Sequence, residues 1–169
     1  MPLWLIGMMG SGKSTIGHII SRRLGWTFID TNELISEAAG RSIRDIFSAE
    51  GEAGFRTREI EAVAAASSEP GAVVATGGGA ILSPRNVRVM RRTGRVFWLQ
   101  AEPSTLAARL EGSGDGSRPL IFEADTEHSL GDMLEARTQR YRMAADFAIG
   151  TDLLSPEEAA DLVEALWLD

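Results

Sequence analysis

Short apolar runs recur along this chain, and longer segments in which apolar residues have helical spacing separate them. The runs lie at 3–6, 26–29, 72–75, 95–99 and 147–149, and each has the length of a buried strand. Strands that alternate with helices predict an α/β fold, a three-layer sandwich in which a mainly parallel five-stranded sheet is flanked by helices. Ligands of such folds bind at the carboxyl ends of the strands, so chemistry is expected there.

A glycine-rich segment directly follows the first of these runs. It reads Gly7-Met8-Met9-Gly10-Ser11-Gly12-Lys13-Ser14-Thr15 and matches the phosphate-loop pattern G-x-x-x-x-G-K-[ST] at every defined position. Behind it, Ile16, Ile19, Ile20 and Leu24 recur at helical spacing. A chance glycine-rich turn is the alternative, but the order strand, glycine loop and helix is the setting that a nucleotide-binding P-loop requires.

Each residue type in this loop suits the binding of a triphosphate. Glycines let successive backbone N–H groups point at phosphate oxygens, at the positive end of the following helix. Lys13, the only lysine in the chain, supplies a compact ammonium group for the β- and γ-phosphates, and Ser14 offers a hydroxyl to Mg²⁺. The predicted site for ATP and Mg²⁺ comprises Gly10, Ser11, Gly12, Lys13, Ser14 and Thr15.

The composition limits the other classes of protein. With 169 residues, 44% of them apolar and 24% charged, the chain is expected to form a single domain over 1–169. It has no cysteine and only two histidines, which excludes disulfides and thiolate metal sites and disfavours zinc. A net charge of −7 argues against nucleic-acid binding. No apolar stretch approaches the ~20 residues of a membrane span, so we expect a cytoplasmic protein without membrane contact, and a monomer.

One segment interrupts the compact pattern. Three glycines fall within five residues at 112–116, and Arg118-Pro119-Leu120-Ile121-Phe122 follows. Such a glycine density does not hold a stable element, which predicts a mobile lid over about 111–124 that brings Arg118 to the phosphates. A plain surface loop is the alternative.

Several segments beyond the P-loop belong to one pattern that extends over almost the whole chain. The pattern comprises Gly7 to Thr15, Phe28-Ile29-Asp30-Thr31-Asn32, Gly40-Arg41-Ser42-Ile43, Ile46-Phe47, Phe55-Arg56 with Glu59, Gly77-Gly78-Gly79-Ala80, Arg118-Pro119-Leu120, and Arg137 before Tyr141. In these segments the chain resembles the shikimate kinases. The resemblance implies a nucleoside monophosphate kinase-like fold and transfer of the γ-phosphoryl group of ATP to a hydroxyl of shikimate, a carboxylic acid.

The resemblance also implies roles for residues outside the P-loop. Asp30, which ends the second strand, would help to hold Mg²⁺ through water and act in catalysis with Lys13 and Arg118, although a strand-terminal aspartate also often caps the next helix. Arg56 and Arg137 would grip the substrate carboxylate, for which the planar guanidinium fork is suited. The backbone of Gly77, Gly78 and Gly79 would approach the same group, and the substrate-binding region would cover about 31–62.

Asn32 departs from the pattern of this family. Shikimate kinases carry Asp-Thr-Asp where this chain reads Asp30-Thr31-Asn32, and their second aspartate contacts the ring hydroxyls of shikimate. A carboxylate only accepts hydrogen bonds, whereas the Asn32 amide has one accepting oxygen and a donating NH₂ group. Three functions stay open: a shikimate kinase, a related kinase for another carboxylate-bearing polyol such as quinate or gluconate, and a nucleotide-binding module without transfer activity.

Overall fold

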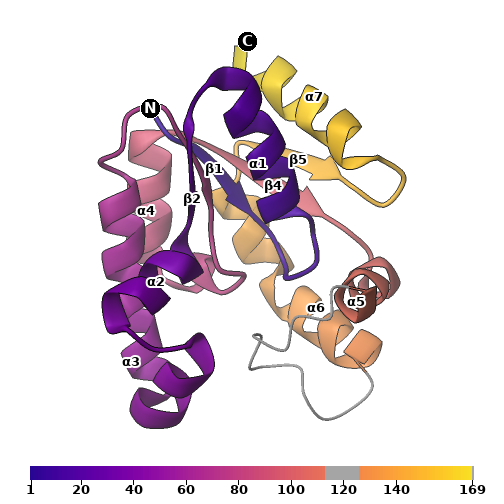
Figure 1. Ribbon diagram of the computed structural model, residues 1–169. Helices are drawn as coiled ribbons and strands as arrows, with labels where there is room; N and C mark the ends of the chain where they lie inside the picture. The colour runs from indigo at the N-terminus through magenta and orange to yellow at the C-terminus, as the bar shows by residue number, and fades with distance from the viewer. Residues whose placement is uncertain (113–125, 169) are drawn as a thin grey trace.

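The computed structural model describes residues 1–112 and 126–168, and its centre is a sheet of five parallel strands in the order β2-β3-β1-β4-β5 (Figure 1). The sequence prediction of a parallel five-stranded sheet is therefore confirmed. Observed and predicted strand limits differ by at most one residue at either end. The strands are β1 (Leu3–Ile6), β2 (Thr27–Asp30), β3 (Ala72–Ala75), β4 (Arg95–Gln100) and β5 (Phe147–Gly150).

Helices occupy the connections between the strands, as the spacing of apolar residues predicts. They are α1 (Lys13–Leu24), α2 (Thr31–Ala39), α3 (Ile43–Ala66), the short 3₁₀ helix η1 (Ala80–Leu82), α4 (Pro84–Thr93), α5 (Pro103–Gly112), α6 (Thr126–Ala144) and α7 (Pro156–Leu168). Among these described helices, none is both long and apolar enough to cross a lipid bilayer.

The central strand β1 shows why the helices form two layers. Its four residues are fully buried, and their side chains alternate between the two faces of the sheet. Leu3 and Leu5 pack with apolar residues of α1 and α7, whereas Trp4 and Ile6 pack with those of α3, α4 and α6. The result is the predicted three-layer sandwich, in which both faces of the parallel sheet are covered (Figure 1).

Helix α3 is divided by a kink at Gly51. Gly51 has φ 68° and ψ −173°, a backbone conformation that glycine adopts without the steric cost that other residues incur. The preceding Glu50 is held by Arg58, at 2.8 and 2.9 Å, and by Arg41 at 2.6 Å. The hydrogen bonds from Arg58 are the main reason why the pKa of Glu50 lies below its ordinary value. Together these contacts shape the segment that corresponds to the predicted substrate-binding region, 31–62.

The predicted lid falls mostly outside the described residues. Its first two residues, Glu111 and Gly112, belong to helix α5. The remainder, including Arg118, lies outside the part of the chain that the structure describes. The lid and the placing of Arg118 at the phosphates thus remain expectations from the sequence.

Candidate active site

A cavity of about 1010 Å³ opens at the carboxyl ends of β1, β2 and β3. Ligands of parallel sheets are expected at this edge, where the connections that follow neighbouring strands lead to opposite sides of the sheet. The P-loop forms one part of its wall, and α2, α3 and the segment after β3 form another. Its lining includes Gly10, Ser11, Gly12, Lys13, Ser14, Thr15, Asp30, Asn32, Arg56, Glu59, Gly77, Gly78, Gly79, Arg109, Arg137 and Thr151.

The P-loop leaves the amino-terminal end of α1 available to an anion. Gly12 precedes the helix with φ 97° and provides no side chain to cap it, and the first turn of α1 contains no acidic residue. By contrast, the helices α2, α3 and α7 each begin with a capping side chain, from Asp30, Ser42 and Ser155. The positive end of the α1 dipole, with its backbone N–H groups, is therefore suited to bind phosphate.

Lys13 is buried against the loop that it follows. Its Nζ atom donates to the carbonyl oxygens of Gly7, at 2.9 Å, and Met8, at 2.8 Å. A third, longer contact of 3.4 Å reaches Oγ of Ser11. These contacts hold the ammonium group inside the loop and beside the cavity, where a nucleotide phosphate would offer it a negatively charged partner.

Asp30 caps helix α2, a role that the sequence left open, and also contacts the P-loop. Its Oδ1 atom accepts a hydrogen bond from the backbone N–H of Asn32 at 2.9 Å, which caps helix α2. Its Oδ2 atom accepts one from the hydroxyl of Ser14 at 3.1 Å. Both side chains line the cavity. A hydroxyl and a carboxylate oxygen this close suit Mg²⁺, which takes few protein ligands and keeps several waters.

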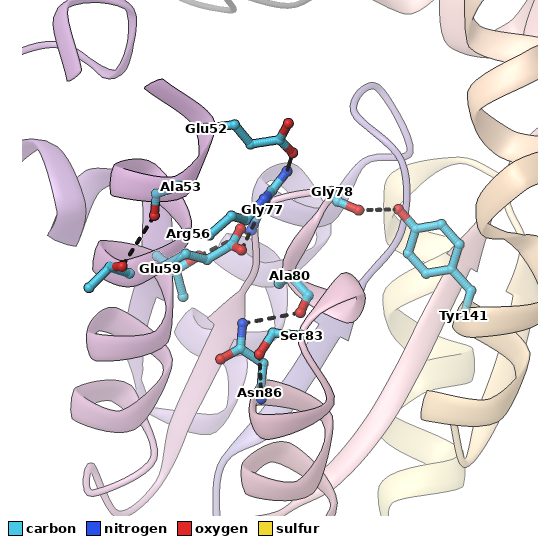
Figure 2. Close-up of polar contacts among 12 residues, drawn as sticks. Glu52, Ala53, Arg56, Glu59, Gly77, Gly78, Ala80, Ser83, Asn86 and Tyr141 are labelled. Carbon is cyan, nitrogen blue, oxygen red and sulfur yellow. Dashed lines mark hydrogen bonds and ion pairs between the residues drawn. The ribbon is translucent and has the colours of Figure 1, made fainter. Parts of the chain in front are cut away.

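Arg56 and Glu59 form an ion pair at the other end of the cavity. The Arg56 guanidinium donates to Oε2 of Glu59 at 2.9 Å and to Glu52 at 3.3 Å, so it lies between the two carboxylates (Figure 2). Glu59 is completely buried. Burial raises the pKa of its carboxyl group, whereas the charges of Arg56 and Arg137 act in the opposite direction. Glu59 thus fixes Arg56 in the cavity wall.

Two of the three consecutive glycines after β3 make room for side chains of the site. A Cβ atom on Gly79 would lie 2.4 Å from both Nη atoms of Arg56, and one on Gly77 would lie 3.0 Å from Oδ1 of Asn32. Their backbone conformations do not require glycine, since none of the three has a positive φ. Close approach of protein side chains therefore explains Gly77 and Gly79, whereas a Cβ atom on Gly78 would meet its neighbours at an ordinary 3.5 Å or more. The predicted approach of this segment to the substrate stays a prediction.

Substituting Gly79 with alanine is expected to displace the Arg56 guanidinium and to raise the KM for the acceptor substrate about 100-fold, because misplacement by about 1 Å can cost that much. The KM for the nucleotide should change little, since the P-loop is untouched. Steady-state kinetics with each substrate varied separately would measure both effects. Gly131→Ala in α6 is a matched control, because its Cβ would meet only Pro103 at an ordinary 3.7 Å. An unchanged acceptor KM in Gly79→Ala would contradict the expectation.

Arg137 joins the site from helix α6. It is half-buried, lines the cavity and lies close enough to Glu59 and Tyr141 to affect both groups. The Tyr141 hydroxyl donates to the carbonyl oxygen of Gly78, which ties α6 to the glycine segment (Figure 2). Burial raises the pKa of Tyr141, so its phenol stays protonated and keeps donating. The fold thus brings Arg56 and Arg137, far apart in sequence, to one cavity.

Some cavity residues were not predicted from the sequence as site residues. Arg109 of α5 donates to Oγ1 and to the carbonyl oxygen of Thr151, at 2.9 and 2.8 Å, and to the carbonyl oxygen of Gly10 at 3.3 Å. No local pattern marks Arg109, because only the packing of α5 against the P-loop places it here. Among apolar residues, Ile43, Phe47 and Phe55 line the cavity and also pack in a core cluster.

Comparison with known proteins agrees with this geometry. The family model for shikimate kinase matches residues 9–167. A shikimate kinase of Symbiobacterium thermophilum is 46% identical over 167 residues, covering 98% of this chain and 96% of the relative. One of Moorella thermoacetica is 42% identical over 170 residues, covering 98% and 95%.

A solved structure extends the likeness to three dimensions. The shikimate kinase from Acinetobacter baumannii, determined in complex with shikimate, matches with a TM-score of 0.88 at 34% identity, over 98% of this chain and 89% of that one. Its agreement in fold accompanies a family match over nearly the full length. The chain therefore belongs to the shikimate kinase family.

Proposed function

We propose that this protein transfers the γ-phosphoryl group of ATP to a hydroxyl of shikimate. One observation carries the proposal: the P-loop with Lys13 and the wall with Arg56, Arg137 and Asn32 line the same cavity. A phosphoryl donor and a carboxylate-bearing acceptor can therefore bind next to each other in one cavity. A nucleotide-binding module without transfer activity would have no need of the arginine-lined wall.

The donor half of the reaction relies on positioning and charge. The transferred phosphoryl group carries negative charge on its oxygens, so the α1 dipole and Lys13 stabilise the transition state by electrostatics. The acceptor hydroxyl oxygen forms a bond to the γ-phosphorus while the bond to the bridging oxygen breaks, ADP leaves, and the hydroxyl proton passes to solvent. Because this transition state is loose, orienting the hydroxyl matters more than deprotonating it early. The neutral Asn32 amide suits orientation, since it does not act as a base at neutral pH.

Mg²⁺ fits the oxygen atoms at the mouth of the P-loop. Ser14 and Asp30 would hold it, with Asp30 acting through water. The ion, when bound, neutralises charge on the β- and γ-phosphates. Asp30 keeps its carboxylate oriented because Oδ1 is occupied by the cap of α2. Chelation of the metal by EDTA is expected to abolish transfer, and added MgCl₂ should restore it.

The acceptor half selects a hydroxylated carboxylic acid. Arg56 and Arg137 each present a guanidinium group that can meet a carboxylate with two hydrogen bonds, and the glycine segment lies beside Arg56. The matched family favours shikimate. Asn32 would contact the substrate hydroxyls with an amide instead of a carboxylate. A second candidate substrate, another carboxylate-bearing polyol such as quinate or gluconate, therefore stays open.

Turnover assays with ATP, Mg²⁺ and each of shikimate, quinate and gluconate test the acceptor. We expect shikimate to give ADP and a phosphorylated product. Its kcat/KM should be at least about tenfold above that of the other two acids, because a wrong substrate leaves buried polar groups of the site unpaired. Glycerol serves as the uncharged control. Turnover of glycerol with none of the acids accepted would exclude a carboxylate acceptor.

The cellular setting follows from the same proposal. An ATP-dependent kinase for a small acid uses the cytoplasmic nucleotide pool, and the net charge of −7 supports a protein without a nucleic-acid partner. A monomer that does not contact membranes is the expected form. Light scattering coupled to size-exclusion chromatography measures that state directly.

A further inference from the structure

Two buried oxygen atoms converge beside Gly77. Within the described residues, Oδ1 of Asn32 and Oε1 of Glu59 receive no hydrogen bond. They lie 3.0 and 3.1 Å from the position that a Cβ atom on Gly77 would occupy, so both face the same small space. Each atom accepts hydrogen bonds, and neither can satisfy the other. Buried acceptors without a donor are costly, and a pair of them in one place requires an explanation.

A proton on Glu59 is disfavoured as the missing donor. The second oxygen of this carboxyl group, Oε2, already accepts from Arg56 at 2.9 Å. Arg137 from α6 adds a second positive charge, while the negative charge of Glu52 on α3 acts against ionisation. Burial is the largest influence and leaves the pKa of Glu59 above its ordinary value, but the ion pair with Arg56 and the charge of Arg137 both stabilise the carboxylate form.

A donor for Oε1 of Glu59 is present in Asn32 itself. The side-chain amide carries one oxygen and one NH₂ group, and a turn of 180° about its Cβ–Cγ bond exchanges the two. The turn moves no other heavy atom. It leaves the backbone N–H of Asn32 on Asp30 Oδ1, so the cap of α2 stays intact. Nδ2 then lies where a donor to Glu59 is needed.

We infer that Nδ2 of Asn32 donates to Oε1 of Glu59, and that this bond turns Oδ1 of Asn32 toward the cavity as the acceptor for a substrate hydroxyl. The inference rests on the proposed function, whose acceptor cavity Asn32 lines. Glu59 is then a positioning residue for two groups at once. One of its oxygens holds the Arg56 guanidinium (Figure 2). The other sets the orientation of the Asn32 amide, so a single buried carboxylate positions both the group that binds the substrate carboxylate and the group that accepts from its hydroxyl.

Substitutions that place an amide at position 59 and a carboxylate at position 32 test which end of the Asn32 amide faces the cavity. In Glu59→Gln, the glutamine Oε1 still accepts from Arg56, but its NH₂ group donates to Oδ1 of Asn32 and leaves the NH₂ group of Asn32 facing the cavity. We expect the KM for the acid to rise about 10- to 100-fold, with the KM for ATP unchanged. In the double variant Asn32→Asp with Glu59→Gln, one Asp oxygen accepts from glutamine and the other faces the cavity. The KM should return to within about threefold of the original value.

Asn32→Asp alone completes the cycle of four proteins. It places a carboxylate beside the Glu59 carboxylate, so it should not improve the KM at neutral pH, whereas the same substitution rescues the Glu59→Gln protein. Circular dichroism checks that all four are folded. If Asn32→Asp changes the KM by the same factor in both backgrounds, or if the double variant is no better than Glu59→Gln, the inferred hydrogen bond is refuted.

A second measurement separates this inference from the choice of substrate. The denaturation midpoints of the same four proteins, without any acid, should also be non-additive, with the double variant more stable than the two single effects predict. If the original protein does not phosphorylate shikimate but the midpoints are coupled, the proposed substrate is wrong and the Asn32–Glu59 bond stands. Additive midpoints would refute the bond whatever the substrate.

Discussion

The Lys13→Met variant is expected to lose phosphoryl transfer by about 10²- to 10³-fold in kcat, the size of effect seen when one preorganised donor to a transition state is removed. Lys13 supplies the only lysine ammonium of the chain and holds it against the carbonyl oxygens of Gly7 and Met8. Methionine has a similar length but no charge, so it fills the space without stabilising the phosphate oxygens. Initial rates of ADP formation at saturating ATP and acid measure the loss.

Two comparisons show whether the charge itself is responsible. Arg22→Met removes an exposed cation from the same helix and should leave kcat unchanged. Lys13→Arg keeps a positive charge but replaces a compact ammonium by a planar fork in a buried position, so it should also fail. A Lys13→Met protein that is folded and retains more than about a tenth of the original kcat would contradict the assigned role.

The Arg56→Met variant should suffer in both binding and stability. Loss of the guanidinium removes charged hydrogen bonds to the acid, so the KM for shikimate should rise about 100-fold. It also leaves Glu59, which is completely buried, without its ion-pair partner, and the free energy of unfolding should fall by about 3 kcal/mol. Steady-state kinetics and urea denaturation measure the two effects independently.

The stability loss in Arg56→Met should depend on pH with a definite sign. Burial already raises the pKa of Glu59, and removal of Arg56, which lowers it, raises it further. The folded state then binds the proton more tightly than the unfolded state does. Stability is therefore greatest below the ordinary Glu pKa and falls as pH rises through the raised one. The deficit should grow with pH in denaturation series; a deficit that shrinks with rising pH would overturn this account of Glu59.

Further variants separate binding from stability. Adding Glu59→Gln to Arg56→Met removes the unpaired buried charge, so stability should recover while the KM stays high. Arg137→Met should weaken acid binding to a similar extent with a smaller loss of stability, because it leaves the Arg56–Glu59 ion pair in place. Equal loss of stability in Arg56→Met and Arg137→Met would mean that the ion pair is not the source.

The local signals in this sequence are strong because they depend on short-range geometry. The four apolar residues of β1 and the glycine loop after them specify strand, loop and helix within the first 24 residues of the chain. Ser155-Pro156 likewise starts α7, where Ser155 and Glu158 cap each other. Asp30 could be placed at the end of β2, but the sequence left open whether it caps the next helix or helps to hold Mg²⁺. In the structure Oδ1 caps α2 and Oδ2 accepts from the Ser14 hydroxyl, since a carboxylate has two oxygens.

The α/β fold, the P-loop and the likeness to a family of kinases could be predicted from the sequence, because strand periodicity and loop chemistry depend on residues that are consecutive in the chain. Which distant side chains meet could be seen only in the folded protein. The tertiary structure placed Arg109 beside Gly10 and Thr151, packed Arg56 against Gly79, and brought the acceptor atoms of Asn32 and Glu59 to one point. These contacts arise where separate helices meet the ends of the strands, and side-chain packing at such junctions has no local pattern from which it could be predicted.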